Sequence, residues 1–204
     1  MSNSSDRIGP TSGAHSLQEA PLVFVNGPFG VGKSSVVDLL SQRITNSIVI
    51  DPEKVGHMLW SQLPNSLHED EFELEPLWPP MSRLLIDLAR RTYDRTLLVP
   101  MTIARPEVFD LIVGGLRDNG HRVRNFTLLA TPTTVRRRLK ERMRDRGEQP
   151  DRWGELSWEG LQIKRCLQSL RRPRFARHIC TEDQSADEVA GLITALLRQE
   201  QKSS

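Results

Sequence analysis

Five short apolar runs divide the chain, and each is followed by a stretch whose apolar residues recur at helical spacing. The runs are Leu22–Asn26, Ser47–Asp51, Thr96–Pro100, Arg124–Ala130 and His178–Thr181. The segments IVID and TLLV within them are continuous rather than alternating, which is typical of strands covered on both faces. Strands and helices that alternate in this way predict an α/β fold of three layers, with a five-stranded parallel sheet between two layers of helices.

The helical stretches carry their apolar residues mostly three or four positions apart. These stripes are Val36, Leu40 and Ile44; Val108, Leu111, Ile112 and Leu116; Val135, Leu139 and Met143; Ile163, Cys166, Leu167 and Leu170; and Val189, Ala190, Ile193 and Leu197. Ser185 and Glu188 have the spacing of a capping box and predict the start of the last helix. Pro106 stands where the first turn of a helix tolerates proline.

Two segments interrupt this alternation. Residues 52–80 are acidic and aromatic (HEDEFELEPLWPP), and residues 144–158 are polar and contain glycine and proline. In open α/β folds such insertions lie at the carboxyl ends of the strands, where sites are built, so we expect a helical acceptor-side insertion and an arginine-rich lid. The Ser/Gly/Pro-rich residues 1–20 are expected to form a disordered leader, and residues 21–204 one domain.

Composition excludes several classes of protein. With 37% hydrophobic and 26% charged residues, the chain can bury a core and stay soluble, and a net charge of +2 does not suggest a nucleic-acid binder. No apolar run approaches the roughly 18 residues of a membrane helix. Cys166 and Cys180 have neither metal-site spacing nor a disulfide pattern. We therefore expect a cytoplasmic protein.

A glycine-rich turn, GPFGVGKS, follows the first strand and fits G-x-x-x-x-G-K-[ST] in full. Glycines let backbone N–H groups surround an anion, the lysine can reach the β- and γ-phosphates, and the serine hydroxyl can bind Mg²⁺. We expect ATP and Mg²⁺ to bind here through Gly27, Pro28, Phe29, Gly30, Val31, Gly32, Lys33, Ser34 and Ser35. The alternative is an ordinary strand-to-helix turn, which the surrounding strand and amphipathic helix disfavour.

Other motifs narrow the class of P-loop protein. The D-x-x-G and N-K-x-D motifs of switch GTPases are absent, and the third strand ends VPMT, without the carboxylate of a motor ATPase. A small kinase of the nucleotide- or metabolite-kinase type remains. Asp51 ends the second strand and Glu53 follows, so Asp51 can accept a hydroxyl proton or orient Mg²⁺-bound water. The alternative is that Asp51 only caps the helix starting at Pro52.

The run RRRLKERMRDR, residues 136–146, is strongly basic and leads into the lid. Positive groups near a transferring phosphoryl group stabilise its charge. The expected contacts to phosphate are Arg138, Arg142 and Arg146, with Lys33, Asp51, Arg138 and Arg142 in catalytic roles; Arg165 can contribute from the next helix. The competing interpretation is a solvated helix face, since the buried stripe of this helix uses only Val135, Leu139 and Met143.

Several segments resemble the TmrB-like tunicamycin-resistance proteins. In order along the chain they are VNGPFGVGKSS, IDPEKVGHML, LWPP, LLVPMTIARPEVF, LLATPTTVRRRLKER, SWEGLQIKRC and HICTEDQSADEVA. The resemblance covers roughly residues 22–197, and DPEKVG and VPMTI are its most specific parts. It implies the P-loop kinase-like fold, ATP binding and a role in resisting tunicamycin, a nucleoside antibiotic that mimics a UDP-sugar substrate. It also places the adenine near Thr181, Glu182 and Asp183.

The resemblance and the residues together predict an ATP-dependent phosphotransferase that inactivates tunicamycin, or a related uracil nucleoside sugar, by phosphorylating a hydroxyl. Its acceptor site is expected over the strand ends, at Asp51, Glu53, Met101, Thr102, Arg105 and Trp78, with Trp60 and Phe72 nearby. For the tryptophans, core packing is the alternative. Two other functions remain open: a housekeeping kinase for a nucleoside, sugar acid or UDP-sugar, and a binding protein that sequesters the antibiotic with ATP. Some members of the resembled family carry a basic amphipathic tail, whereas this chain ends LLRQEQKSS, so peripheral membrane association is the lesser expectation.

Overall fold

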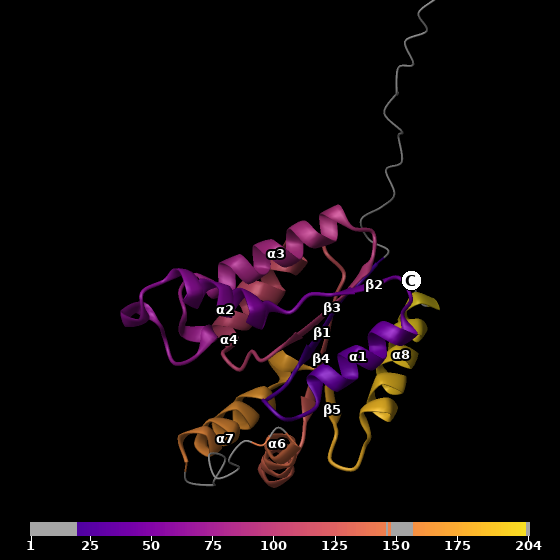
Figure 1. The fold of residues 1–204 in the computed structure, drawn as a ribbon. Helices are drawn as coiled ribbons and strands as arrows, with labels where there is room; N and C mark the ends of the chain where they lie inside the picture. The colour runs from indigo at the N-terminus through magenta and orange to yellow at the C-terminus, as the bar shows by residue number, and fades with distance from the viewer. Residues whose placement is uncertain (1–19, 146, 148–156, 203–204) are drawn as a thin grey trace, which may run out of the picture.

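The protein is described by a computed structural model, which covers residues 20–145, 147 and 157–202. One sheet of five parallel strands, in the order β2-β3-β1-β4-β5, runs through its centre (Figure 1). The strands are β1 (Leu22–Asn26), β2 (Ser47–Val49), β3 (Thr96–Met101), β4 (Val123–Leu129) and β5 (His178–Cys180). The predicted α/β fold with a five-stranded parallel sheet is therefore confirmed.

Helices cover both faces of this sheet, with α2, α3 and α4 on one side in Figure 1 and α1, α6, α7 and α8 on the other. The α-helices are α1 (Lys33–Arg43), α2 (Pro52–Gln62), α3 (Trp78–Thr92), α4 (Pro106–Phe109), α5 (Gly115–Asp118), α6 (Pro132–Asp145), α7 (Trp158–Leu170) and α8 (Ala186–Lys202). Shorter turns are η1 (Asn65–Leu67), η2 (Phe72–Leu74), η3 (Asp110–Gly114) and η5 (Pro173–Phe175). The turn η3 is a π-type turn that joins α4 and α5.

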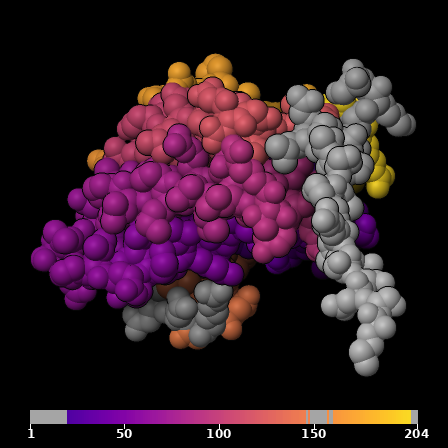
Figure 2. Space-filling model, turned by 90° about the horizontal axis from the view of Figure 1, so that it is seen from above, coloured from indigo at the N-terminus to yellow at the C-terminus, as the bar shows by residue number. Residues whose placement is uncertain are grey.

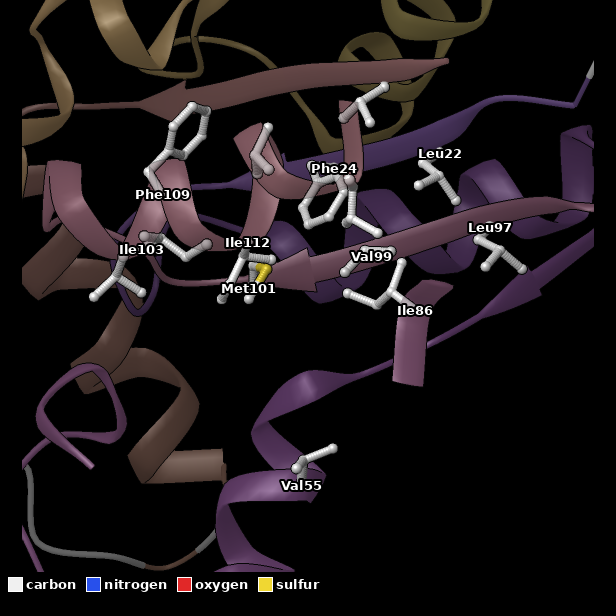
Figure 3. Packing of buried hydrophobic residues seen from close by; sticks show 14 of the residues in the cluster. Leu22, Phe24, Val55, Ile86, Leu97, Val99, Met101, Ile103, Phe109 and Ile112 are labelled. Carbon is white, nitrogen blue, oxygen red and sulfur yellow. The ribbon is translucent and has the colours of Figure 1, made fainter. Parts of the chain in front are cut away.

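The central strand β1 shows why the sheet needs two layers of helices. Its side chains alternate between the faces, so Leu22 and Phe24 enter one hydrophobic core while Val23 and Val25 enter the other. All four are fully buried, which accounts for the continuous apolar sequence. Figure 3 shows the first core, where Phe24 lies near Val99 of β3 and Ile112 of η3.

The predicted boundaries differ from the observed ones mainly at strand ends. β2 ends at Val49 rather than Asp51, although the Ile50 N–H still donates to the Leu98 carbonyl at 2.9 Å. The capping box before α8 is confirmed, since the Glu188 N–H donates to Ser185 Oγ and the Ser185 N–H to Glu188 Oε2. The leader, most of the lid and Arg146 lie outside the described residues.

The insertion at residues 52–80 is helical, as expected, and contains α2, η1, η2 and the start of α3. The face seen in Figure 2 is formed largely by this insertion together with the rest of α3 and the α4–α5 region. Among the described residues, no helix is both long enough and apolar enough to cross a membrane.

Candidate active site

The glycine-rich turn connects β1 to α1 at the carboxyl end of the sheet. Gly30 has a φ of +77°, and a Cβ there would lie 2.4 Å from Leu139 Cγ of α6. Both the backbone conformation and the close approach therefore require glycine. Within the described residues, no side chain accepts a hydrogen bond from the N-terminal N–H groups of α1. The N–H groups of its first turn are therefore available to an anion.

Lys33 is held against this turn. Its Nζ donates to the carbonyl oxygens of Gly27 at 2.9 Å and Pro28 at 3.1 Å, and lies 5.4 Å from the centroid of the Phe29 ring. Burial lowers the pKa of Lys33, because desolvation disfavours the ammonium, while attraction by Glu53 opposes the effect. A phosphate beside Nζ would compensate this buried charge directly.

A cavity of about 610 Å³, here called the P-loop cavity, opens in front of the turn. Its lining includes residues 29–36 and, from other elements, Asp51, Glu53, Arg138 and Arg142. The loop after β5 contributes Thr181, Gln184 and Ser185, and the start of α8 contributes Ala186. The P-loop cavity thus brings together the expected phosphate site and part of the neighbourhood expected for the adenine.

The two arginines of α6 that line the P-loop cavity differ in their contacts. Arg138 Nη1 donates to the Val31 carbonyl at 3.2 Å and to Thr181 Oγ1 at 3.1 Å, and its Nη2 donates to the Thr181 carbonyl. These bonds tie α6 to the phosphate loop and to the loop after β5. Arg142 is exposed and has no partner among the described residues, so it is the arginine whose charge is available to a phosphate.

Asp51 both caps α2 and lines the P-loop cavity. Its Oδ1 accepts a hydrogen bond from the Glu53 N–H at 3.0 Å, so the capping role considered for this residue is present. Asp51 and Glu53 also attract the Lys33 ammonium electrostatically, which places their carboxylates near the phosphate end of the cavity. Capping and a role beside the phosphates are therefore compatible.

A second cavity of about 850 Å³, here called the insertion cavity, lies between the insertion, the loop after β3 and α7. Its aromatic wall is formed by His57, Trp60, Phe72 and Trp78. The Phe72 ring is central, with its centroid 4.3 Å from that of Trp60 and 6.0 Å from that of Trp78. Trp78 is also buried in the core and donates from Nε1 to the Pro52 carbonyl at 2.8 Å, so core packing holds for this residue while it also lines the cavity.

The aromatic wall explains the sequence VGH in α2. A Cβ on Gly56 would lie 2.5 Å from the Phe72 ring, so the absence of a side chain at Gly56 lets the ring pack against the helix. His57, the next residue, meets the same ring edge-on with centroids 5.1 Å apart. Gly56 therefore positions one wall of the insertion cavity.

Most of the expected acceptor residues line the insertion cavity. Thr102, Arg105 and Glu53 do so, and Arg165 of α7 joins them there rather than at the phosphates. Met101 does not: its side chain is fully buried in the hydrophobic core and lines neither cavity. Because the side chains of a strand alternate, Met101 faces the α3 layer while Thr102 reaches the cavity, which corrects the predicted role of Met101.

The two cavities adjoin. Phe29 and Glu53 line both of them, and Cys166 of α7 lines the insertion cavity. Burial raises the pKa of the Cys166 thiol to about 12, so this cysteine is a neutral part of the wall.

Two residues of this region were not found from the sequence. Asn26, at the end of β1, bonds to both backbone polar groups of Ile103, and Glu73 of η2 accepts from the N–H groups of Ala104 and Arg105 at 2.8 Å. An asparagine before a glycine-rich turn and one glutamate in an acidic run carry no distinguishing pattern. Only the folded loop after β3 gives them partners.

A parallel sheet with a P-loop between its central strand and the next helix defines a P-loop protein of the kinase-like class. A family model described as AAA domain matches residues 22–161, and the chain belongs to this family. The match includes the phosphate loop, the insertion and α6.

Solved structures show the same fold. A tunicamycin resistance protein from Deinococcus radiodurans is 26% identical with a TM-score of 0.68, covering 87% of this chain and 96% of that chain. Shikimate kinase from Bacteroides thetaiotaomicron is 14% identical with a TM-score of 0.57, over 87% of this chain and 98% of that chain. The APS kinase of Mycobacterium tuberculosis, solved with AMPPNP and APS, is 19% identical with a TM-score of 0.57, over 88% and 98%. The comparison with curated proteins found no significant match.

Proposed function

We propose that this protein is an ATP-dependent phosphotransferase whose acceptor is a hydroxyl of tunicamycin or of a related uracil nucleoside sugar. The observation that carries the proposal is the pair of adjoining cavities. One is lined by the phosphate loop and the other by aromatic and polar side chains, and Phe29 and Glu53 belong to both. This is the arrangement that direct transfer between two bound molecules requires.

Tunicamycin is favoured as the acceptor by similarity to tunicamycin-resistance proteins. The chain shares 26% identity with the tunicamycin resistance protein of Deinococcus radiodurans over nearly the whole of both chains. The segments DPEKVG and VPMTI resemble the TmrB-like proteins, and both border the cavities. The aromatic wall suits a ligand with planar and apolar parts.

In this mechanism the phosphate loop and Lys33 hold the β- and γ-phosphates of ATP, and Arg142 adds charge at the transferring group. Asp51 accepts the proton as the acceptor hydroxyl oxygen forms its bond to the γ-phosphorus. The bond to the β–γ bridging oxygen breaks, and ADP leaves with that oxygen. The product phosphate ester carries about −1.5 to −2 charge, which would spoil a mimic of a UDP-sugar.

The residues present fit Mg²⁺ bound together with the nucleotide. Ser34 lines the P-loop cavity and its hydroxyl has no hydrogen-bond partner among the residues that the structure describes, and Asp51 can contact the ion through water. Mg²⁺ would supply charge neutralisation across the β- and γ-phosphates. Within the described ranges, no group of three or more His, Cys, Asp or Glu side chains could hold a metal ion by itself, so phosphate oxygens of the nucleotide would have to be among the ligands of Mg²⁺.

Incubation with Mg·ATP and tunicamycin, followed by mass spectrometry, tests the proposal. We expect a product heavier by one phosphoryl group with the wild-type chain and no product with Lys33→Ala. If tunicamycin binds tightly but stays unmodified at stoichiometric enzyme, the protein sequesters the antibiotic instead. Turnover of a nucleoside, a sugar acid or a UDP-sugar, without turnover of tunicamycin, would identify a housekeeping kinase.

A further inference from the structure

We propose that Glu73 selects the acceptor: one carboxylate oxygen fixes the loop after β3, and the other accepts a hydrogen bond from an N–H or O–H group of the bound molecule. This inference deepens the proposed function and rests on it, because it concerns the same acceptor site. It assigns a specific role to a residue of the acidic run in the insertion.

The first oxygen is already engaged. Glu73 Oε1 accepts hydrogen bonds from the N–H groups of both Ala104 and Arg105, at 2.8 Å each. From the other side, Ser169 Oγ of α7 donates to the Ala104 carbonyl. The loop that carries Arg105 is thus held between the insertion and α7, and Glu73 is the link to the insertion.

The second oxygen is available to a ligand. Within the described part of the chain no donor is bonded to Glu73 Oε2, although Glu73 lines the insertion cavity. Two other unpartnered atoms of this cavity wall, Trp60 Nε1 and Thr102 Oγ1, are sealed from solvent, whereas Glu73 Oε2 is not among the sealed atoms. Glu73 therefore offers an accessible hydrogen-bond acceptor next to the Phe72 ring.

The surroundings of Glu73 make its ionisation sensitive to what binds. Burial raises the pKa of Glu73 to about 7, and the two backbone N–H bonds from Arg105 and Ala104 only partly offset this. The charged or titratable groups that line the same cavity are Asp70 and Glu71 on its own segment, Arg105 and Glu107 beyond β3, Glu53 and His57 on α2, and Arg165 and Cys166 on α7. Glu71 raises and Arg105 lowers the pKa of Glu73, and the Cys166 thiol stays neutral.

A ligand donor bonded to Oε2 favours the carboxylate over the carboxylic acid. Binding of such a ligand must therefore lower the pKa of Glu73, and by linkage a higher pH must strengthen binding. With a pKa of about 7 in the free protein, ionisation rises from about one tenth at pH 6 to about nine tenths at pH 8. The affinity is then expected to increase about tenfold across this interval.

The test measures binding to the full-length chain by calorimetry at pH 6, 7 and 8, with a non-hydrolysable ATP analogue present and with tunicamycin and uridine as probes. Glu73→Gln keeps an oxygen for the two N–H groups but loses the charge. It is expected to weaken binding at pH 8 about tenfold and to abolish the pH dependence. Glu69→Gln makes the same charge change at an exposed position outside both cavities and is expected to behave as wild type.

Carbon-13 NMR of the Glu73 carboxyl in the wild-type chain provides a second readout that needs no variant. The proposal predicts that at least one probe lowers the pKa of this carboxyl. It is overturned if neither probe does so, if wild-type affinity is independent of pH, or if affinity falls as pH rises. The phosphorylation assay reports separately on the proposed function. A phosphorylated product together with an unchanged pKa of Glu73 would overturn only this inference. A changed pKa of Glu73 without any product would overturn only the proposed phosphotransferase activity.

Discussion

Asn26 at the end of β1 and Ile103 in the loop after β3 form a reciprocal pair of hydrogen bonds. Asn26 Nδ2 donates to the Ile103 carbonyl and the Ile103 N–H donates to Asn26 Oδ1, each at 2.9 Å. The same Oδ1 accepts from the Gly27 N–H at 2.8 Å. One buried side chain therefore sets the start of the phosphate loop relative to the loop that borders the insertion cavity.

Asn26→Ala is expected to lower the free energy of unfolding by about 3 kcal/mol, because it leaves three buried backbone groups without their partner. Urea denaturation measures this. Asn46→Ala is a suitable control, since Asn46 donates a single hydrogen bond, to the Asp94 carbonyl, in an exposed position. Its cost should stay below about 1 kcal/mol, and equal losses in the two variants would contradict the importance assigned to Asn26.

Gly56→Ala should weaken acceptor binding more than nucleotide binding. Alanine would favour the helix, but its Cβ would lie 2.5 Å from the Phe72 ring, which the aromatic neighbours confine. We expect a loss of about 1–3 kcal/mol in unfolding free energy and a displaced aromatic wall. Near-ultraviolet circular dichroism would detect the displaced aromatic wall. Calorimetry with a non-hydrolysable ATP analogue and with tunicamycin would compare nucleotide binding with acceptor binding.

Gly114→Ala is the matched control for this substitution, because the nearest atom to its new Cβ is Asp110 Cβ at an ordinary 3.8 Å. It should leave both ligands bound as in the wild type. If both glycine variants behave alike, the packing of Phe72 on α2 does not position the cavity wall.

Substitutions of Arg138 and Arg142 are predicted to have different effects: the first lowers stability and the second lowers the catalytic rate. Arg138→Ala breaks hydrogen bonds from a charged group to the loop after β5 and should lower the free energy of unfolding by about 2 kcal/mol. Arg142→Ala removes from the P-loop cavity a cation that no described residue pairs with. If the protein is the proposed phosphotransferase, kcat should fall about 100-fold with little change in stability.

Arg137→Ala controls for charge on the same helix, because Arg137 is exposed and pairs only with Glu141 at 3.0 Å among the described residues. Its effect on unfolding should stay within about 0.5 kcal/mol. A kcat loss for Arg137→Ala as large as that for Arg142→Ala would mean that the general charge of α6, and not Arg142, matters.

The strands and most helices could be predicted because their burial follows from apolar residue types at fixed spacing. Helix α3 could not. It buries Trp78, Ser82, Ile86, Ala89 and Arg90, and leaves Leu84, Leu85 and Leu88 exposed. The most apolar stripe of the helix is thus not the buried one. The polar residues Ser82 and Arg90 face inward, and Arg90 Nε finds a partner in the Ala20 carbonyl, a contact that only the folded chain reveals.

The phosphate site was predictable and the acceptor site only in part, for a physical reason. The phosphate loop acts through backbone groups whose conformation depends on the closely spaced Gly27, Gly30 and Gly32, so its residues lie in one short segment of the sequence. The insertion cavity is lined by residues from α2, η2, the loop after β3 and α7, which lie far apart in the sequence. No spacing rule in the sequence predicts that Glu73 contacts Ala104. Nor does spacing predict that Thr102 rather than Met101 reaches the cavity, because that depends on where β3 ends.

The pH dependence of stability should depend on Asp87 of α3. Burial alone would raise the pKa of Asp87, but hydrogen bonds with His121, Arg91 and Asn119 outweigh it and lower the pKa to about 2. In the unfolded chain an aspartate titrates near 3.9. Because the folded pKa is the lower one, the stabilisation is complete well above pH 4 and is lost as the pH falls towards 2.

Asp87→Asn should therefore lower the unfolding free energy at pH 7 by about 2 kcal/mol, and the gap to wild type should narrow between pH 4 and pH 2. Asp94→Asn changes the same charge just beyond α3, where the Asp94 side chain is 84% exposed and its Oδ1 lies 3.6 Å from Arg90 Nη2. That variant should cost less than about 0.5 kcal/mol at any pH. Denaturant titrations of the wild type and both variants from pH 7 to pH 2 measure these differences in unfolding free energy. A gap for Asp87→Asn that stays constant down to pH 2 would mean that packing around Asn119 and His121, rather than the charge of Asp87, joins α3 to the start of β4.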